Sequence, residues 1–133
     1  MLAILISFIF LFVSFAAEGA DWKLYAQNAP LEPGIQGNAY YDKDSIAYPF
    51  KTKGFFGMKE DKSIVSVWEK LTFPQQNREI RILCYVSCQQ RQITLKSIIS
   101  DGNYIYPPQP FLDHPFGIEP NSTDEKLYKI LCR

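Results

Sequence analysis

Three cysteines are the residues of this 133-residue chain whose spacing most directly limits its chemistry. Cys84 and Cys88 are four positions apart, which spans ~13 Å along a strand, whereas bonded cysteines have Cα atoms ~4.4–6.8 Å apart. In an oxidising compartment Cys132 is therefore expected to be one partner of a disulfide. Geometry favours Cys88 as the other partner, because it lies at the expected end of a strand. The pairing Cys84–Cys132 is the alternative.

The single histidine, His114, gives little support for catalysis or metal binding. One histidine cannot build the usual zinc site, and Cys84-x-x-x-Cys88 does not have the CxxC spacing of a redox pair. The sequence also contains no nucleophile elbow, P-loop or GxGxxG motif. We therefore predict a protein that is not an enzyme and has no catalytic residues, no metal and no cofactor. A small periplasmic enzyme built around His114 or Cys84 is the least favoured alternative.

Two segments combine aromatic and cationic residues in a way that is typical of binding surfaces. The first, Lys51–Lys62, holds two adjacent phenylalanines among four lysines, and the second, Tyr104–Phe116, holds aromatics among prolines. The candidate binding residues are Lys53, Phe55, Phe56, Tyr104, Tyr106 and Phe111. The simpler interpretation, which we favour, is that the lysines solvate a loop while the aromatic rings fold back onto the core.

Composition limits the size and the partners of the protein. The chain is long enough for one domain, and its hydrophobic fraction of 47% is sufficient for a core. Fourteen basic residues balance fourteen acidic residues. A near-neutral domain has no electrostatic footprint for nucleic acid, and its net charge does not predict adsorption to anionic lipid.

The N-terminus has the pattern of a secretory signal. Met1–Ala17 contains no charged residue, and the small residues Ala17 and Gly19 precede Ala20 at the positions that a signal peptidase requires. We expect residues 1–19 to be a signal peptide and residues 20–133 to be the mature domain, located in the periplasm, at the cell surface or secreted. The alternative is a retained anchor, which would be the only membrane contact, although a spanning helix needs ~20 apolar residues.

Hydrophobic periodicity indicates a β-rich mature domain. Alternation and β-branched or aromatic runs predict six strands, at Trp22–Ala26, Asn38–Asp42, Ile64–Phe73, Glu79–Cys88, Arg91–Ile99 and Tyr104–Tyr106. Proline and glycine predict loops at 28–38 and 107–115, and Phe50–Lys62 is expected to be a long exposed connection. We therefore expect an α+β fold: an antiparallel meander of about six strands with one short helix.

The C-terminus changes to a helical period. Ser122 is a suitable N-cap, and Glu125 three residues later completes the pattern of a capping box. Leu127, Ile130 and Leu131 form an apolar face that would pack on the sheet.

Several segments, taken together, resemble the surface-adhesin protein E family of Gram-negative bacteria. They are Trp22, Tyr40–Ile46, Val65–Trp68, Cys88 followed by Arg91, and the ending from Ile118 to Cys132. The resemblance implies an antiparallel sheet with a C-terminal helix tethered by a disulfide, and it agrees with the pairing Cys88–Cys132. The founding adhesin is a surface lipoprotein that binds host matrix and plasma proteins, and haem has been implicated. This chain lacks a cysteine that could accept lipid near the cut.

The resemblance implies a non-catalytic exported binding or accessory domain of the bacterial cell envelope that binds host or envelope proteins. The alternative is a structural subunit of an envelope assembly, such as a pilus or secretion accessory protein. Exposed sheet edges would also permit a dimer.

Overall fold

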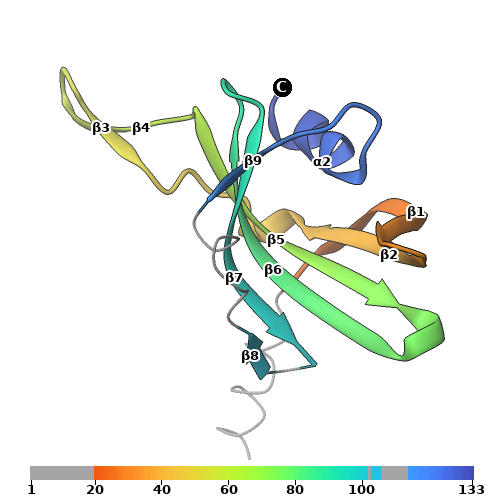
Figure 1. The fold of residues 1–133 in the computed structure, drawn as a ribbon. Helices are drawn as coiled ribbons and strands as arrows, with labels where there is room; N and C mark the ends of the chain where they lie inside the picture. The colour runs from red at the N-terminus through yellow and green to blue at the C-terminus, as the bar shows by residue number, and fades with distance from the viewer. Residues whose placement is uncertain (1–19, 102, 106–113) are drawn as a thin grey trace, which may run out of the picture.

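The structure, a computed structural model, describes residues 20–101, 103–105 and 114–133. Six strands form one antiparallel sheet in the order β1-β2-β5-β6-β7-β8, and a short strand, β9, also pairs with β7. These strands are β1 (Trp22–Glu32), β2 (Ile35–Asp42), β5 (Ile64–Phe73), β6 (Arg78–Ser87), β7 (Gln92–Ser100), β8 (Asn103–Ile105) and β9 (Pro115–Gly117). The sheet curls into a half-barrel, with one helix at the C-terminus (Figure 1). The predicted six-strand meander is confirmed.

The centre of the sheet is the pair β5–β6, which runs in continuous register from Ile64↔Ser87 to Phe73↔Arg78. Because side chains alternate along a strand, Val67 of β5 and Cys84 of β6 face each other on the inner side, and both are fully buried. Their neighbours on β5 and β6, Trp68 and Leu83, therefore face outward. The predicted strand at 64–73 has the same bounds in the structure, and the prediction for β6 differs by one residue at each end.

Helix α2 (Thr123–Leu131) packs on the inner face of the curled sheet (Figure 1). Leu127 is fully buried in the same cluster as Val67, Cys84 and Val86, and Leu131 packs at the edge of that cluster. Burying a leucine side chain contributes roughly 1.5–3 kcal/mol. The helix therefore closes the open side of the half-barrel.

A disulfide joins Cys88, directly after β6, to Cys132, directly after α2, with Cα atoms 5.4 Å apart. The hydroxyl of Tyr128 donates a hydrogen bond to the carbonyl of Cys88 at 2.8 Å, close to the disulfide. Cys84 is a free, buried thiol. The favoured pairing is thus confirmed and the alternative Cys84–Cys132 is wrong.

The start of α2 is capped by Ser122, whose hydroxyl accepts a hydrogen bond from the N–H of Glu125 at 3.2 Å. The reciprocal bond of a capping box would run from the N–H of Ser122 to the carboxylate of Glu125. Instead Glu125 accepts from the N–H of Asn121 at 3.3 Å and forms an ion pair with Arg91 at 2.9 Å. Ser122 is the N-cap as expected, but the box is not closed as expected.

The loop predicted at 28–38 is wrong, because β1 and β2 run through most of it as a hairpin. Three register shifts interrupt the β1–β2 pairing, and Asn28 has a positive φ of 49°. β1 lies at the edge of the sheet, where the N–H that Pro30 lacks is not needed by another strand. Irregular edge pairing thus accommodates residues that are typical of loops.

The exposed connection predicted at 50–62 contains a second, two-stranded sheet made of β3 (Lys51–Gly54) and β4 (Gly57–Glu60). This hairpin extends away from the main sheet (Figure 1). Short 3-10 turns, η1 (Lys43–Ser45) and η2 (Pro74–Gln76), follow β2 and β5. Pro115, expected in a loop, opens β9, a position where proline is tolerated in a strand.

Candidate binding site

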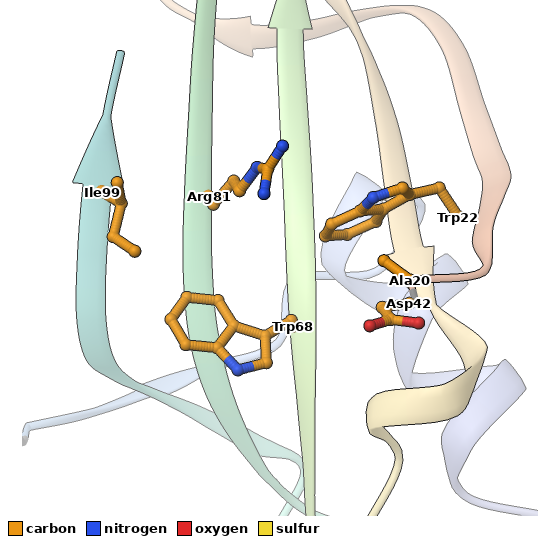
Figure 2. A pocket seen from close by; sticks show the side chains of 6 residues that line it. All are labelled: Ala20, Trp22, Asp42, Trp68, Arg81 and Ile99. Atoms are coloured by element: carbon orange, nitrogen blue, oxygen red, sulfur yellow. The ribbon is translucent and has the colours of Figure 1, made fainter. Parts of the chain in front are cut away.

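An open hollow of about 240 Å³ lies on the outer face of the sheet, on the side opposite to α2 (Figure 2). Its lining comes from the start of β1, the end of β2, and β5, β6 and β7. The lining residues are Ala20, Trp22, Asp42, Trp68, Arg81 and Ile99. Trp22 and Trp68 are the two tryptophans of the chain, so this hollow gathers both of them.

Sheet register brings these distant residues together. Trp22 pairs with Asp42 across β1–β2, and Arg81 pairs with Ile99 across β6–β7. Arg81 also lies opposite Lys70 of β5, two residues beyond Trp68 and thus on the same face. Because the residues at positions 67, 69 and 71 fill the inner side, the alternation of β5 directs Trp68 and Lys70 outward.

Two cationic side chains make cation–π contacts with the ring of Trp22. The ammonium of Lys70 lies 4.7 Å from the Trp22 ring centroid and 4.9 Å from that of Tyr40, and the Arg81 guanidinium carbon lies 5.5 Å from Trp22. Each such contact contributes roughly 0.5–1 kcal/mol at an exposed site. The ion pair between Arg81 and Glu79 at 3.1 Å joins two exposed side chains and adds little stability. Trp22 is therefore positioned before any ligand arrives.

Asp42 fixes the backbone at the opposite rim. One oxygen of its carboxylate accepts hydrogen bonds from the N–H groups of Asp21 at 2.9 Å and Asp44 at 3.0 Å. These bonds cap η1 and tie the beginning of β1 to the end of β2. Asp42 is thus both a structural cap and the negatively charged member of the hollow.

The hollow combines two indole rings, an aliphatic wall from Ile99, the donors of Arg81 and the acceptors of Asp42 (Figure 2). Indole faces and an aliphatic wall suit a flat apolar group, while guanidinium and carboxylate groups can bind a polar edge or a backbone amide. The lining contains no Ser, Thr, Cys, Lys or His side chain, and its one carboxylate, that of Asp42, accepts hydrogen bonds from two backbone N–H groups. The arrangement is suited to recognition.

The aromatic–lysine segment forms the β3–β4 hairpin, which extends away from the main sheet (Figure 1), and none of its residues lines the hollow. Phe55 and Phe56 occupy its turn and are 95% and 98% exposed, and Lys53 is exposed on β3. The interpretation that these rings fold back onto the core is therefore wrong. Tyr104 belongs to β8, whereas the predicted signal peptide 1–19, Tyr106 and Phe111 lie outside the described residues. The binding roles of all six candidates stay predictions.

A buried carboxylate lies on the inner face, beneath α2. Glu69 is only 6% exposed, and its carboxylate accepts a hydrogen bond of 2.5 Å from the hydroxyl of Tyr25. Burial raises the pKa of Glu69 to about 7, although the Tyr25 hydrogen bond works in the opposite direction. Burial likewise raises the pKa of the Cys84 thiol, and partial desolvation raises the pKa of Asp124, an exposed residue on the first turn of α2. A substrate cannot reach Glu69 or Cys84, which are both buried, so we assign these two groups to the core.

The described part of the chain gives little support for a histidine-based site, a metal site or a membrane-spanning helix. His114 is exposed directly before β9. Within residues 20–101, 103–105 and 114–133, no cluster of His, Cys, Asp and Glu side chains could hold a metal ion. In these same ranges no helix is both long and apolar enough to cross a membrane.

The sequence did not single out Arg81, Asp42 and Ile99 as candidate residues. A usable signal was present for Trp68, since Trp68 and Lys70 are two positions apart in a predicted strand and therefore share a face. Comparisons of the chain with models of protein families, with curated proteins and with solved structures found no match.

Proposed function

We propose that this protein is an exported, non-catalytic binding domain of the bacterial cell envelope, similar to surface-adhesin protein E. Its outer-face hollow binds a side chain of a host or envelope protein. One observation carries this proposal: both tryptophans of the chain meet in one open hollow, together with Arg81 and Asp42.

Export is supported by two independent features. The first is the signal pattern of residues 1–19. The second is the disulfide Cys88–Cys132, since such bonds persist mainly in oxidising compartments. The predicted cut before Ala20 would also place the new α-ammonium group at the rim of the hollow, because Ala20 belongs to the lining. Processing would then complete the site.

A protein partner is favoured by the size and composition of the hollow. Pockets for drug-sized ligands have volumes of about 300–1,000 Å³, whereas this hollow, at about 240 Å³, suits one ring-bearing side chain. Tryptophan and arginine are also the residues that most often dominate binding energy in protein interfaces. A phenylalanine, tyrosine or proline of the partner would stack on Trp68 while Arg81 binds a neighbouring carbonyl.

Direct binding to immobilised envelope and host matrix proteins, each purified, tests this proposal. The variant Trp68→Ala removes one wall of the hollow, whereas Leu24→Ala changes an exposed residue of β1 that is not part of the lining. Loss of an interface hot spot weakens binding by about 30-fold or more. We expect that loss for Trp68→Ala and unchanged binding for Leu24→Ala. Equal binding by both variants and the natural protein would refute the site, and turnover of a substrate by the purified protein would refute the class.

A further inference from the structure

The tip of the β3–β4 hairpin exposes apolar side chains that make almost no contact with the rest of the described structure. Phe55 and Phe56 form its two-residue turn and are 95% and 98% exposed, and Met58 beside them is 67% exposed. Their rings contact each other edge to face at 4.9 Å between centroids. Gly57, with φ of +122°, allows the tight turn. Exposed apolar clusters of this kind mark interaction sites.

Charges are distributed unevenly along the hairpin. Lys51, Lys53 and Lys59 are exposed on its two strands, and Lys62 follows β4. Glu60 lies opposite Lys51 at the base and Asp61 follows it, so both acidic side chains are far from the tip. The segment nearest to the rings is therefore purely cationic, although the whole chain has no net charge.

We propose that the β3–β4 hairpin binds the surface of a bilayer that contains anionic lipid, with Phe55 and Phe56 inserted at the interface. Apolar groups of interfacial segments reach ~5–10 Å into the boundary between headgroups and acyl chains. Lys53 and Lys59 lie two and three residues from the rings, which corresponds to ~7–10 Å along a strand. Their ammonium groups would thus reach the phosphates while the rings are inserted.

The shape of the tip favours lipid over a protein partner. A stable protein interface buries ~800 Å² on each partner, whereas the tip offers two rings and one thioether on a convex turn. A bilayer adapts to such a shape, and the nearby lysines complement its negative surface. The base is held to the main sheet, because Phe50 contacts Tyr85 edge to face at 5.9 Å between centroids.

A label at the tip tests this inference directly. Phe56→Cys places a reactive thiol at the turn, while Cys84 is buried and the other two cysteines are bonded. The labelled residue carries an environment-sensitive fluorophore, and the vesicles contain phosphatidylcholine with or without about a third phosphatidylglycerol. We expect a blue shift with the anionic vesicles only. A retained apolar segment at residues 1–19 would insert into both kinds of vesicle, so it would not produce a shift that is restricted to the anionic vesicles.

The matched control is Leu24→Cys with the same label, at an exposed residue of β1 that is remote from the hairpin. In the Phe56→Cys background, Lys53→Gln and Lys59→Gln should each weaken vesicle binding about fivefold. An unchanged tip label, an equal shift at position 24, or no effect of either lysine would overturn the proposal. A tip label that responds to a purified protein but not to vesicles would overturn it as well. Trp68→Ala should leave the tip response intact, so the two proposals fail independently.

Discussion

The hydroxyl of Tyr25 on β1 donates a hydrogen bond of 2.5 Å to the carboxylate of Glu69 on β5, beneath α2. This bond crosses from the edge of the sheet to its centre and is enclosed by the helix that the disulfide tethers. A carboxylate in this position is costly to ionise, because burial disfavours the charged form. The interior is therefore most stable when Glu69 keeps its proton.

The raised pKa of Glu69 gives stability a definite dependence on pH. Its pKa is about 7 in the folded protein and about 4.5 in the unfolded chain, so the folded state binds more protons between these values. Stability then falls as pH rises through this window, by about 3 kcal/mol in total. Partial desolvation also raises the pKa of Asp124, which therefore acts in the same direction at lower pH. Urea unfolding at pH 5, 6, 7 and 8 measures this slope.

Glu69→Gln isolates the contribution of this carboxylate. The amide oxygen can still accept from Tyr25, but the side chain cannot ionise. We expect the variant to match the natural protein near pH 5 and to be more stable at pH 8. An identical pH slope for both proteins would show that Glu69 does not titrate as its burial implies.

The disulfide should supply much of the stability of the domain. Cys88 and Cys132 are 44 residues apart, and closing a loop of this length contributes ~4 kcal/mol. Cys88→Ser, Cys132→Ser and the double variant should lose similar amounts, because either change removes the same bond. Urea unfolding compares the three. A stability unchanged by reduction would contradict this expectation.

The single thiol of Cys84 provides a check that does not depend on stability. It is fully buried, so a thiol reagent should react with one group per chain, and only after denaturant is added. Rapid reaction in the folded protein, or more than one reactive thiol, would contradict the assigned pairing.

Gly37 of β2 should not tolerate a side chain. A Cβ atom there would lie 2.4 Å from the backbone oxygen of Thr72 and 2.9 Å from Leu31. Gly37→Ala should therefore cost about 1–3 kcal/mol through overpacking. Gly117→Ala is the matched control, since its Cβ would have no neighbour within 4 Å, and a change within about 0.5 kcal/mol is expected. Thermal or urea unfolding of both variants measures these changes in stability. Equal stabilities of the two variants would refute the close approach of Gly37 to the backbone of Thr72.

The central strands and the helix could be predicted from the sequence because their signals are local. The alternation of β5 and β6 and the cap at Ser122 each depend on residues within one element. The β1–β2 hairpin could not be predicted in this way. Its proline and glycine residues are tolerated because β1 lies at the edge of the sheet and pairs with β2 in an irregular register. Those conditions exist only once the sheet has formed.

The hollow was not predictable for a related reason. Periodicity shows that Trp68 and Lys70 share a face of one strand, but it does not show which residues of β1 and β6 lie beside them. Register brings Trp22 and Arg81 next to this face. In contrast, the candidate residues Phe55 and Phe56 were identified from local composition, and only the structure shows that their rings are exposed.

The most direct test of the binding site uses the fact that both tryptophans of the chain line the hollow. Their emission can be followed while capped peptides that differ in one residue, glycine, leucine, proline or phenylalanine, are added. We expect a saturable change with proline or phenylalanine, none with glycine, and a weaker response in Arg81→Gln. Emission that does not change with any of the peptides, or changes equally with all of them, would contradict the account.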